Sequence, residues 1–172
     1  MRKLFRRYPR LGILAMFSDS QLYRLKYQHE TIAELVHGFT EEQLRKEVNQ
    51  GKWSVQQNIA HLASYQEVFL ERLHSIQTED GPAFGRYVAD NDPRFLEAAN
   101  KSVAQLLEQL RTDRQIIQKT LDSISMQRTA IHARFGKMDV PQWLEFFLLH
   151  EAHHLYTIFM LTADLRTSYI YR

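Results

Sequence analysis

The chain has 172 residues, of which 44% are hydrophobic and 24% are charged, a length and balance typical of a single globular domain. It contains no cysteine, which excludes a disulfide framework, a thiolate metal site and a thiol nucleophile, and agrees with a cytoplasmic location. The formal net charge is only +2, and the first ten residues carry basic side chains without any acid. The remainder is therefore slightly acidic, and nucleic-acid binding is not expected.

Residues 1–19 are predicted to form an N-terminal arm, and residues 20–172 the bundle domain. The arm is basic and then apolar, which is also the order found in signal peptides, but its apolar run is short, Pro9 precedes it, and no small-residue cleavage site follows. We expect the arm to pack on the body or on a second subunit, because a free apolar run promotes aggregation. The side chains expected to be buried are Leu11, Ile13, Leu14, Met16 and Phe17.

The first half of the chain is predicted to be helical. Apolar residues at helical spacing indicate one long helix over residues 18–38, which ends at a glycine. A short helix follows Thr40, because Thr40–Gln43 has the pattern of a capping box. A second capping box at residues 54–57 begins another long helix, which continues to about residue 75.

The second half begins with a polar loop rich in glycine and proline, followed by irregular or short helical turns and then a helix over residues 103–124. A final helix begins at Asp139, has Pro141 in its first turn, and runs to about Asp164. This helix is apolar on nearly every side, so we expect it to be buried in the core. It does not reach the roughly 20 uninterrupted apolar residues of a membrane span.

No segment shows strand alternation long enough to build a sheet. The predicted fold class is therefore all-α, a four-helix bundle with one long irregular loop between the second and third long helices. Bundle interiors are where such proteins place metal and ligand sites.

Histidines in the apolar final helix indicate a metal site. His150 and His154 are four residues apart, so they project from one face of the helix and can share an ion. His61, in the second long helix, is the best candidate for a third ligand. Three imidazoles with an open position are typical of catalytic zinc sites, and the absence of obvious oxygen ligands argues against calcium or magnesium.

The string from His150 to His154 also matches the zinc-protease signature H-E-x-x-H. We reject a protease because Met160 stands where the extended signature needs a further histidine, and Asp164 is the only later carboxylate. Glu151 and His153 flank the ligands, and either could shuttle protons or hold a ligand ring in place.

The sequence resembles the DinB-like superfamily of metal-binding four-helix bundles over residues 20–163. The matching pieces are Gly51-Lys-Trp-Ser54, His61-Leu62, Phe135-Gly136, Trp143-Leu144 and the run from His150 to His154. The resemblance implies that His61, His150 and His154 hold one divalent metal ion, zinc or nickel, with water completing the sphere. It also implies a homodimer.

Relatives in this superfamily include thiol S-transferases and thiol-dependent isomerases. The resemblance therefore implies a metal-dependent transferase or hydrolase acting on a small-molecule substrate, with an external low-molecular-weight thiol as co-substrate or water as nucleophile. Residues Leu155-Tyr156-Thr157 replace the Arg-Gly-Gln frequent in relatives, so no particular substrate is transferred. The alternative is a non-catalytic ligand-binding or stress-response bundle whose metal is structural or absent.

Overall fold

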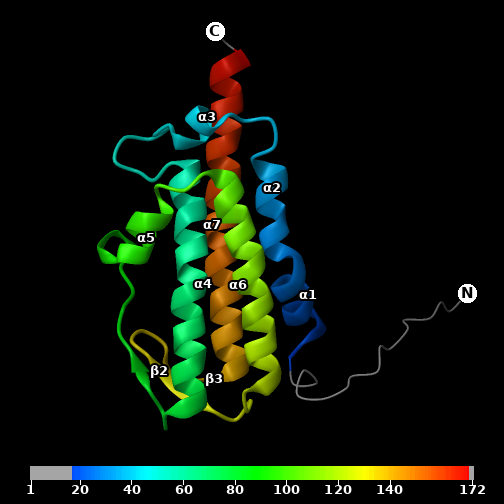
Figure 1. The fold of residues 1–172 in the computed structure, drawn as a ribbon, viewed down its shortest axis with the longest axis vertical. Coiled ribbons are helices and arrows are strands. Elements are labelled where there is room, and N and C mark those ends of the chain that lie inside the picture. The colour runs from blue at the N-terminus through cyan, green and yellow to red at the C-terminus, as the bar shows by residue number, and fades with distance from the viewer. Residues whose placement is uncertain (1–16, 171–172) are drawn as a thin grey trace, which may run out of the picture.

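The computed structural model describes residues 17–170, with side chains as far as residue 167, and within this part the chain forms a bundle of four helical segments (Figure 1). The four-helix bundle predicted from the sequence is confirmed. The first segment comprises α1 (Asp19–Tyr27), the 3-10 helix η2 (Gln28–Glu30) and α2 (Thr31–Leu35), and the others are α4 (Val55–Thr78), α6 (Val103–Ser123) and α7 (Val140–Ile170). Shorter helices are α3 (Glu41–Arg45), η3 (Ala89–Asn91) and α5 (Pro93–Ala98).

Helix starts are fixed by reciprocal capping. At α3 and α4 the predicted capping boxes are present. The hydroxyls of Thr40 and Ser54 accept hydrogen bonds from the backbone N–H three residues later, and the side chain of the glutamine at that position accepts one from the backbone N–H of the threonine or serine. The same arrangement begins α1 and α6. Each box satisfies amide groups that a helix leaves without intrahelical partners, which explains why these helices begin at a serine or threonine.

The first segment is not the continuous helix that was predicted. The 3-10 turn η2 interrupts it, and α2 ends at Leu35. The interruption lies where Gln28 donates a hydrogen bond of 2.9 Å to the carbonyl of Leu148 in α7. The tighter turn therefore coincides with a polar contact between the first and last helices of the bundle.

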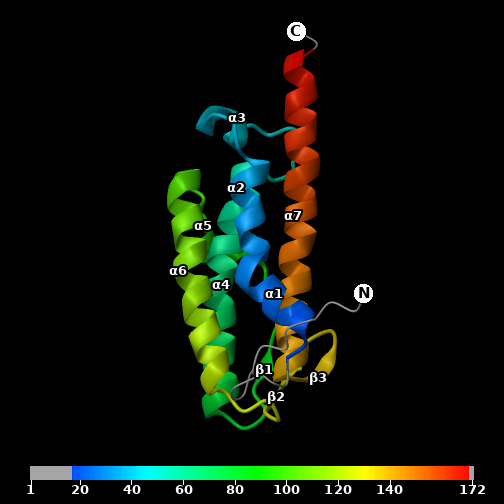
Figure 2. The same ribbon diagram turned by 90° about the vertical axis from the view of Figure 1, so that its right-hand side faces the viewer.

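The expectation of an all-α chain is wrong in one detail, because a small sheet closes one end of the bundle (Figure 2). Strand β2 (Thr129–His132) pairs in parallel with β1 (Ala83–Phe84) and antiparallel with β3 (Gly136–Asp139). The predicted irregular loop between α4 and α6 thus contains β1 as well as η3 and α5. Strands of two to four residues are too short to display alternation in the sequence.

Helix α7 is only partly the buried helix that was predicted. It extends to Ile170, and its last turns stand clear of the other helices in Figure 2. Trp143 and Leu148 are fully buried, but one side of the helix exposes large apolar side chains, namely Leu149, Tyr156, Phe159 and Met160. Within the part of the chain that the structure describes, no helix is long and apolar enough to cross a membrane.

The core consists of two apolar clusters stacked along the bundle. One surrounds Trp143 and Phe69 near the sheet, and the other surrounds Ile59 and Leu106. Phe17 is 1% exposed and belongs to the first cluster, as predicted for the end of the arm. The other arm residues expected to be buried, Leu11, Ile13, Leu14 and Met16, lie outside the described residues. The boundary between arm and domain stays a prediction.

Candidate metal centre

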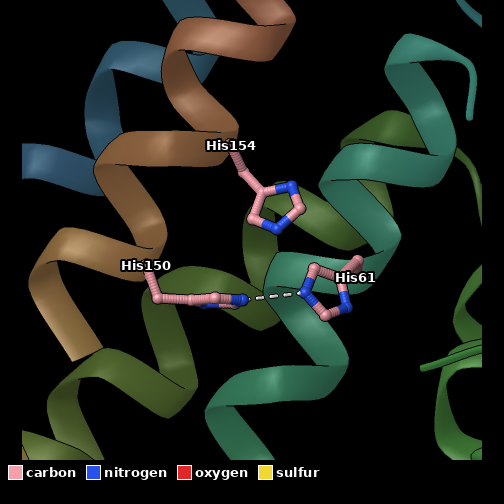
Figure 3. A group of neighbouring side chains, drawn as sticks. All are labelled: His61, His150 and His154. Carbon is pink, nitrogen blue, oxygen red and sulfur yellow. Dashed lines mark hydrogen bonds between the residues drawn. The ribbon is translucent and has the colours of Figure 1, made fainter. Parts of the chain in front are cut away.

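Three histidines from two helices meet in the interior of the bundle (Figure 3). Helix α4 presents His61, while α7 presents His150 and His154 one turn apart. Each offers one ring nitrogen to a group whose atoms all lie within 4.8 Å of one another. The Nε2 atoms of His61 and His150 are 3.0 Å apart. The structure thus brings together the three residues that the sequence named.

The donor set fits a divalent ion. Three nitrogens at roughly 2.0–2.1 Å from a tetrahedral zinc ion are separated from each other by about 3.3 Å. The observed separations of 3.0 Å for one pair and at most 4.8 Å within the group approach that arrangement, so small side-chain rotations suffice. Three imidazoles without thiolates suit zinc or nickel better than the harder cations.

Burial keeps these imidazoles neutral. It is the main reason why the pKa of His61 falls to about 4 and that of His154 to about 3. The pKa of His150 falls to about 2, through burial first and then the nearby His154 and His61. A metal binds the neutral form of histidine, so at neutral pH no proton has to be displaced from the ring nitrogens.

Aromatic rings enclose the triad. The ring centroid of Tyr65 lies 4.1 Å from that of His150, and those of Trp53 and Tyr87 lie 5.0 and 5.9 Å from that of His61. Such a wall lowers the local dielectric constant and strengthens electrostatic interactions inside it.

Asn58 holds one of the candidate ligands in place. Its Oδ1 atom lies 2.9 Å from Nδ1 of His154, and its amide nitrogen donates a bond of 2.9 Å to the carbonyl of Ser54. That second bond fixes which end of the amide faces His154, so Nδ1 donates and Nε2 keeps its lone pair for an ion. Asn58 was not predicted from the sequence, although an asparagine three residues before His61, on the apolar side of a helix, was a usable signal.

Replacing Asn58 with alanine is expected to weaken metal binding by about 10- to 100-fold, because His154 loses the acceptor that sets its tautomer. Competition with a chromophoric chelator measures the affinity, and circular dichroism reports the fold. Asn100→Ala is the matched control, since the side chain of Asn100 donates to the carbonyl of Leu96 on an exposed surface. Equal metal affinity in both variants would contradict this role.

Glu151 and His153 lie beside the triad in different environments. Glu151 is 1% exposed, and its two oxygens are engaged, one by Arg114 and the other by Gln28 at 2.9 Å. His153 is exposed, with its ring centroid 5.2 Å from that of His154. Neither joins the group of nitrogen atoms. A proton-transfer role stays a prediction for both, and the exposed ring of His153 suits it better than the engaged carboxylate of Glu151.

His132 is the last residue of β2, next to the turn that leads to β3. Its Nδ1 accepts hydrogen bonds from the amides of Arg134 and Phe135, and its ring packs against Phe146 at a centroid distance of 4.8 Å. Phe146 in turn packs against His150. His132 therefore shapes the turn that follows β2, and the ring of Phe146 separates it from the candidate ligand His150.

The sequence model of the DinB superfamily matches residues 24–158, a segment that includes all three histidines. The chain belongs to the DinB superfamily. The resemblance noted from the sequence is thereby confirmed. No curated protein matches this DinB chain.

Two solved structures share the DinB chain's fold. YfiT from Bacillus subtilis, described as a probable metal-dependent hydrolase with an unusual four-helix bundle topology, aligns with a TM-score of 0.73 at 18% identity, covering 94% of this chain and 93% of its own. TT2238, described as a four-helix bundle protein, aligns with a TM-score of 0.60 at 20% identity, covering 81% and 96%. At these identities the likeness concerns the fold.

Proposed function

We propose that this DinB protein is a metal-dependent hydrolase of small-molecule substrates, with one divalent ion held by His61, His150 and His154. The observation that carries the proposal is the group of three neutral imidazoles, with His61 buried and His150 and His154 partly buried. Within residues 17–167, no carboxylate and no further histidine joins that group. A site with three protein ligands leaves a coordination position for a reactant, whereas structural zinc sites are closed by a fourth ligand.

When bound, a divalent ion with an open position supplies Lewis-acid chemistry and lowers the pKa of a water or thiol that it binds. The residues of the chain prepare the site for this. Asn58 sets the tautomer of His154, and the rings of Trp53, Tyr65 and Tyr87 limit the access of bulk water. We assign the proton-transfer role to His153, whose side chain is exposed beside the triad.

The description of YfiT as a probable metal-dependent hydrolase supports water as the nucleophile. Transfer of an external thiol uses the same Lewis acid, and the chain itself has no cysteine to provide one. Two other expectations, a cytoplasmic location and a homodimer, stay predictions. The exposed apolar side of α7 offers a face that a second copy could cover.

The decisive experiment begins with protein purified without a polyhistidine tag. We expect about one zinc or nickel ion per chain by elemental analysis, and turnover of at least one substrate in a panel of esters, lactones and amides. A chelator should abolish turnover, and the restored ion should return it. Parallel reactions of electrophiles with and without added thiols distinguish transfer from hydrolysis. Metal-free protein, or turnover that survives chelation, would refute the proposal.

A further inference from the structure

Arg72 is a buried cation on the same helix as the candidate metal ligand His61. It lies eleven residues further along α4, which is about three turns, so the two residues share a face of the helix. Its side chain is 8% exposed. Its guanidinium carbon lies 5.5 Å from the ring centroid of Phe84 in β1, and 5.8 Å from those of Tyr65 and Trp143.

Among the described residues, this guanidinium has no acidic partner. Its hydrogen bond among the described residues is a donation from Nη1 to the hydroxyl of Tyr65, at 3.0 Å. No aspartate or glutamate of residues 17–167 forms an ion pair with it. Residues 1–16 and 168–172 contain no acidic side chain that could serve instead.

Arg114, also buried, differs from Arg72 because its charge is neutralised within the chain. Arg114 pairs with Glu151 and also donates to Gln66 and to the carbonyl of Leu25. Arginine has five N–H donors, and a buried charge without a counter-ion is costly. Stacking on aromatic rings compensates for only part of that cost. The environment of Arg72 is therefore that of a cation whose partner comes from outside the chain.

Tyr65 connects this cation to the metal centre. One side of its ring packs against His150, while its hydroxyl accepts the hydrogen bond from Arg72. Side chains on a helix lean toward its N-terminus, so Arg72 extends from its own turn toward the turns that carry Tyr65 and His61.

We propose that Arg72 binds a carboxylate group of the substrate, placing the substrate's reacting group toward His61, His150 and His154. The binding of a carboxylate is inferred from the environment of Arg72. The orientation of the substrate toward the three histidines rests on the proposed function. A carboxylate suits the site because its two oxygens match the planar guanidinium fork. A single cation among aromatic rings neutralises a monoanion, whereas a phosphate dianion would keep an uncompensated charge in a medium of low dielectric constant.

The test compares acetate with its neutral isostere acetamide, at constant ionic strength, through the fluorescence of Trp143 beside Arg72. We expect acetate to bind and acetamide not to bind. Acetate affinity should fall about 10- to 100-fold in Arg72→Met, the loss expected for hydrogen bonds to a charged group. The control is Arg86→Met, which removes an exposed arginine from the β1–η3 connection and should leave the affinity unchanged.

Chelated protein separates this proposal from the proposed function. Acetate binding that persists after chelation and depends on Arg72 supports the subsite whether or not the metal is catalytic. Binding that disappears with the metal but survives Arg72→Met places the carboxylate on the ion and overturns the subsite. Tighter binding of inorganic phosphate than of acetate overturns the assignment to a monoanion.

If Arg72→Met fails to fold, the wild-type protein still tests the proposal by NMR. The ¹⁵Nε–Hε signal of Arg72, assigned by its absence in Arg72→Lys, should shift as acetate is added and remain in place with acetamide. A signal that does not respond to acetate would overturn the proposal without any reference to activity.

Discussion

Replacing His154 with alanine is expected to abolish metal binding and metal-dependent turnover while leaving the helical fold intact. Two remaining imidazoles hold a divalent ion far less tightly than three. The fold, by contrast, rests on two apolar clusters that extend along the whole bundle. Alanine has the highest helix propensity, and the imidazole that it replaces is neutral and partly buried. The variant therefore loses a ligand without losing a core residue.

The measurement has to separate metal binding from intrinsic stability, because any ligand that binds only the native state raises the melting temperature. We therefore compare His154→Ala with the wild type after chelation, by circular dichroism melts. The two should differ by a few degrees at most, and added zinc should raise the melting temperature of the wild type alone. His153→Ala is the control, since it removes the neighbouring exposed ring and should keep the metal.

The opposite outcome would identify a structural metal. If chelation unfolded the wild-type protein at room temperature, the free energy of metal binding would be what stabilises the fold, as in zinc fingers. The metal-bound triad would then be a structural cross-link between α4 and α7, and the hydrolase proposal would fail. A bundle with this much buried apolar surface does not belong to the small domains that need such a clip.

The bundle and the histidine triad could be predicted because both rest on short-range patterns. Helical periodicity and capping boxes can be recognised within a short stretch of consecutive residues. The spacing of four between His150 and His154 places both side chains on one face of the helix. Assigning His61 as their partner required a choice among distant histidines. That choice depended on its apolar neighbours in the sequence and on the family resemblance.

The sheet and the buried arginines depend on contacts that no local pattern records. Strands β1 and β2 are separated by the whole of α6, so their pairing cannot be recognised in either segment alone. Arg114 lies in a helix rich in polar residues, yet it is 1% exposed. Only the position of Glu151 on the facing helix shows why a cation can be buried there.

Substituting Arg114 with methionine is expected to destabilise the protein by about 3–5 kcal/mol, the largest effect on stability that we predict for a single polar residue. Arg114 joins three other parts of the bundle: its Nη2 pairs with Glu151 in α7, its Nε donates to Gln66 in α4 at 2.9 Å, and its Nη1 donates to the carbonyl of Leu25 in α1 at 3.0 Å. The change leaves the carboxylate of Glu151 buried without its cation. Urea unfolding measures the loss, and Arg111→Met, which removes an exposed ion pair with Glu108, should cost less than about 1 kcal/mol.

The double variant Arg114→Met/Glu151→Met tests whether the ion pair itself stabilises the fold. The alternative is that each charge only needs the other to offset the cost of its burial. Removing both charges also removes both desolvation penalties, so the double variant should be more stable than either single variant by at least about 2 kcal/mol. Some loss should remain, about 1–3 kcal/mol, because the buried oxygen of Gln66 and the carbonyl of Leu25 lose their donor. A double variant as unstable as Arg114→Met would mean that the arginine stabilises the bundle through those two acceptors. The ion pair with Glu151 would then contribute nothing beyond them.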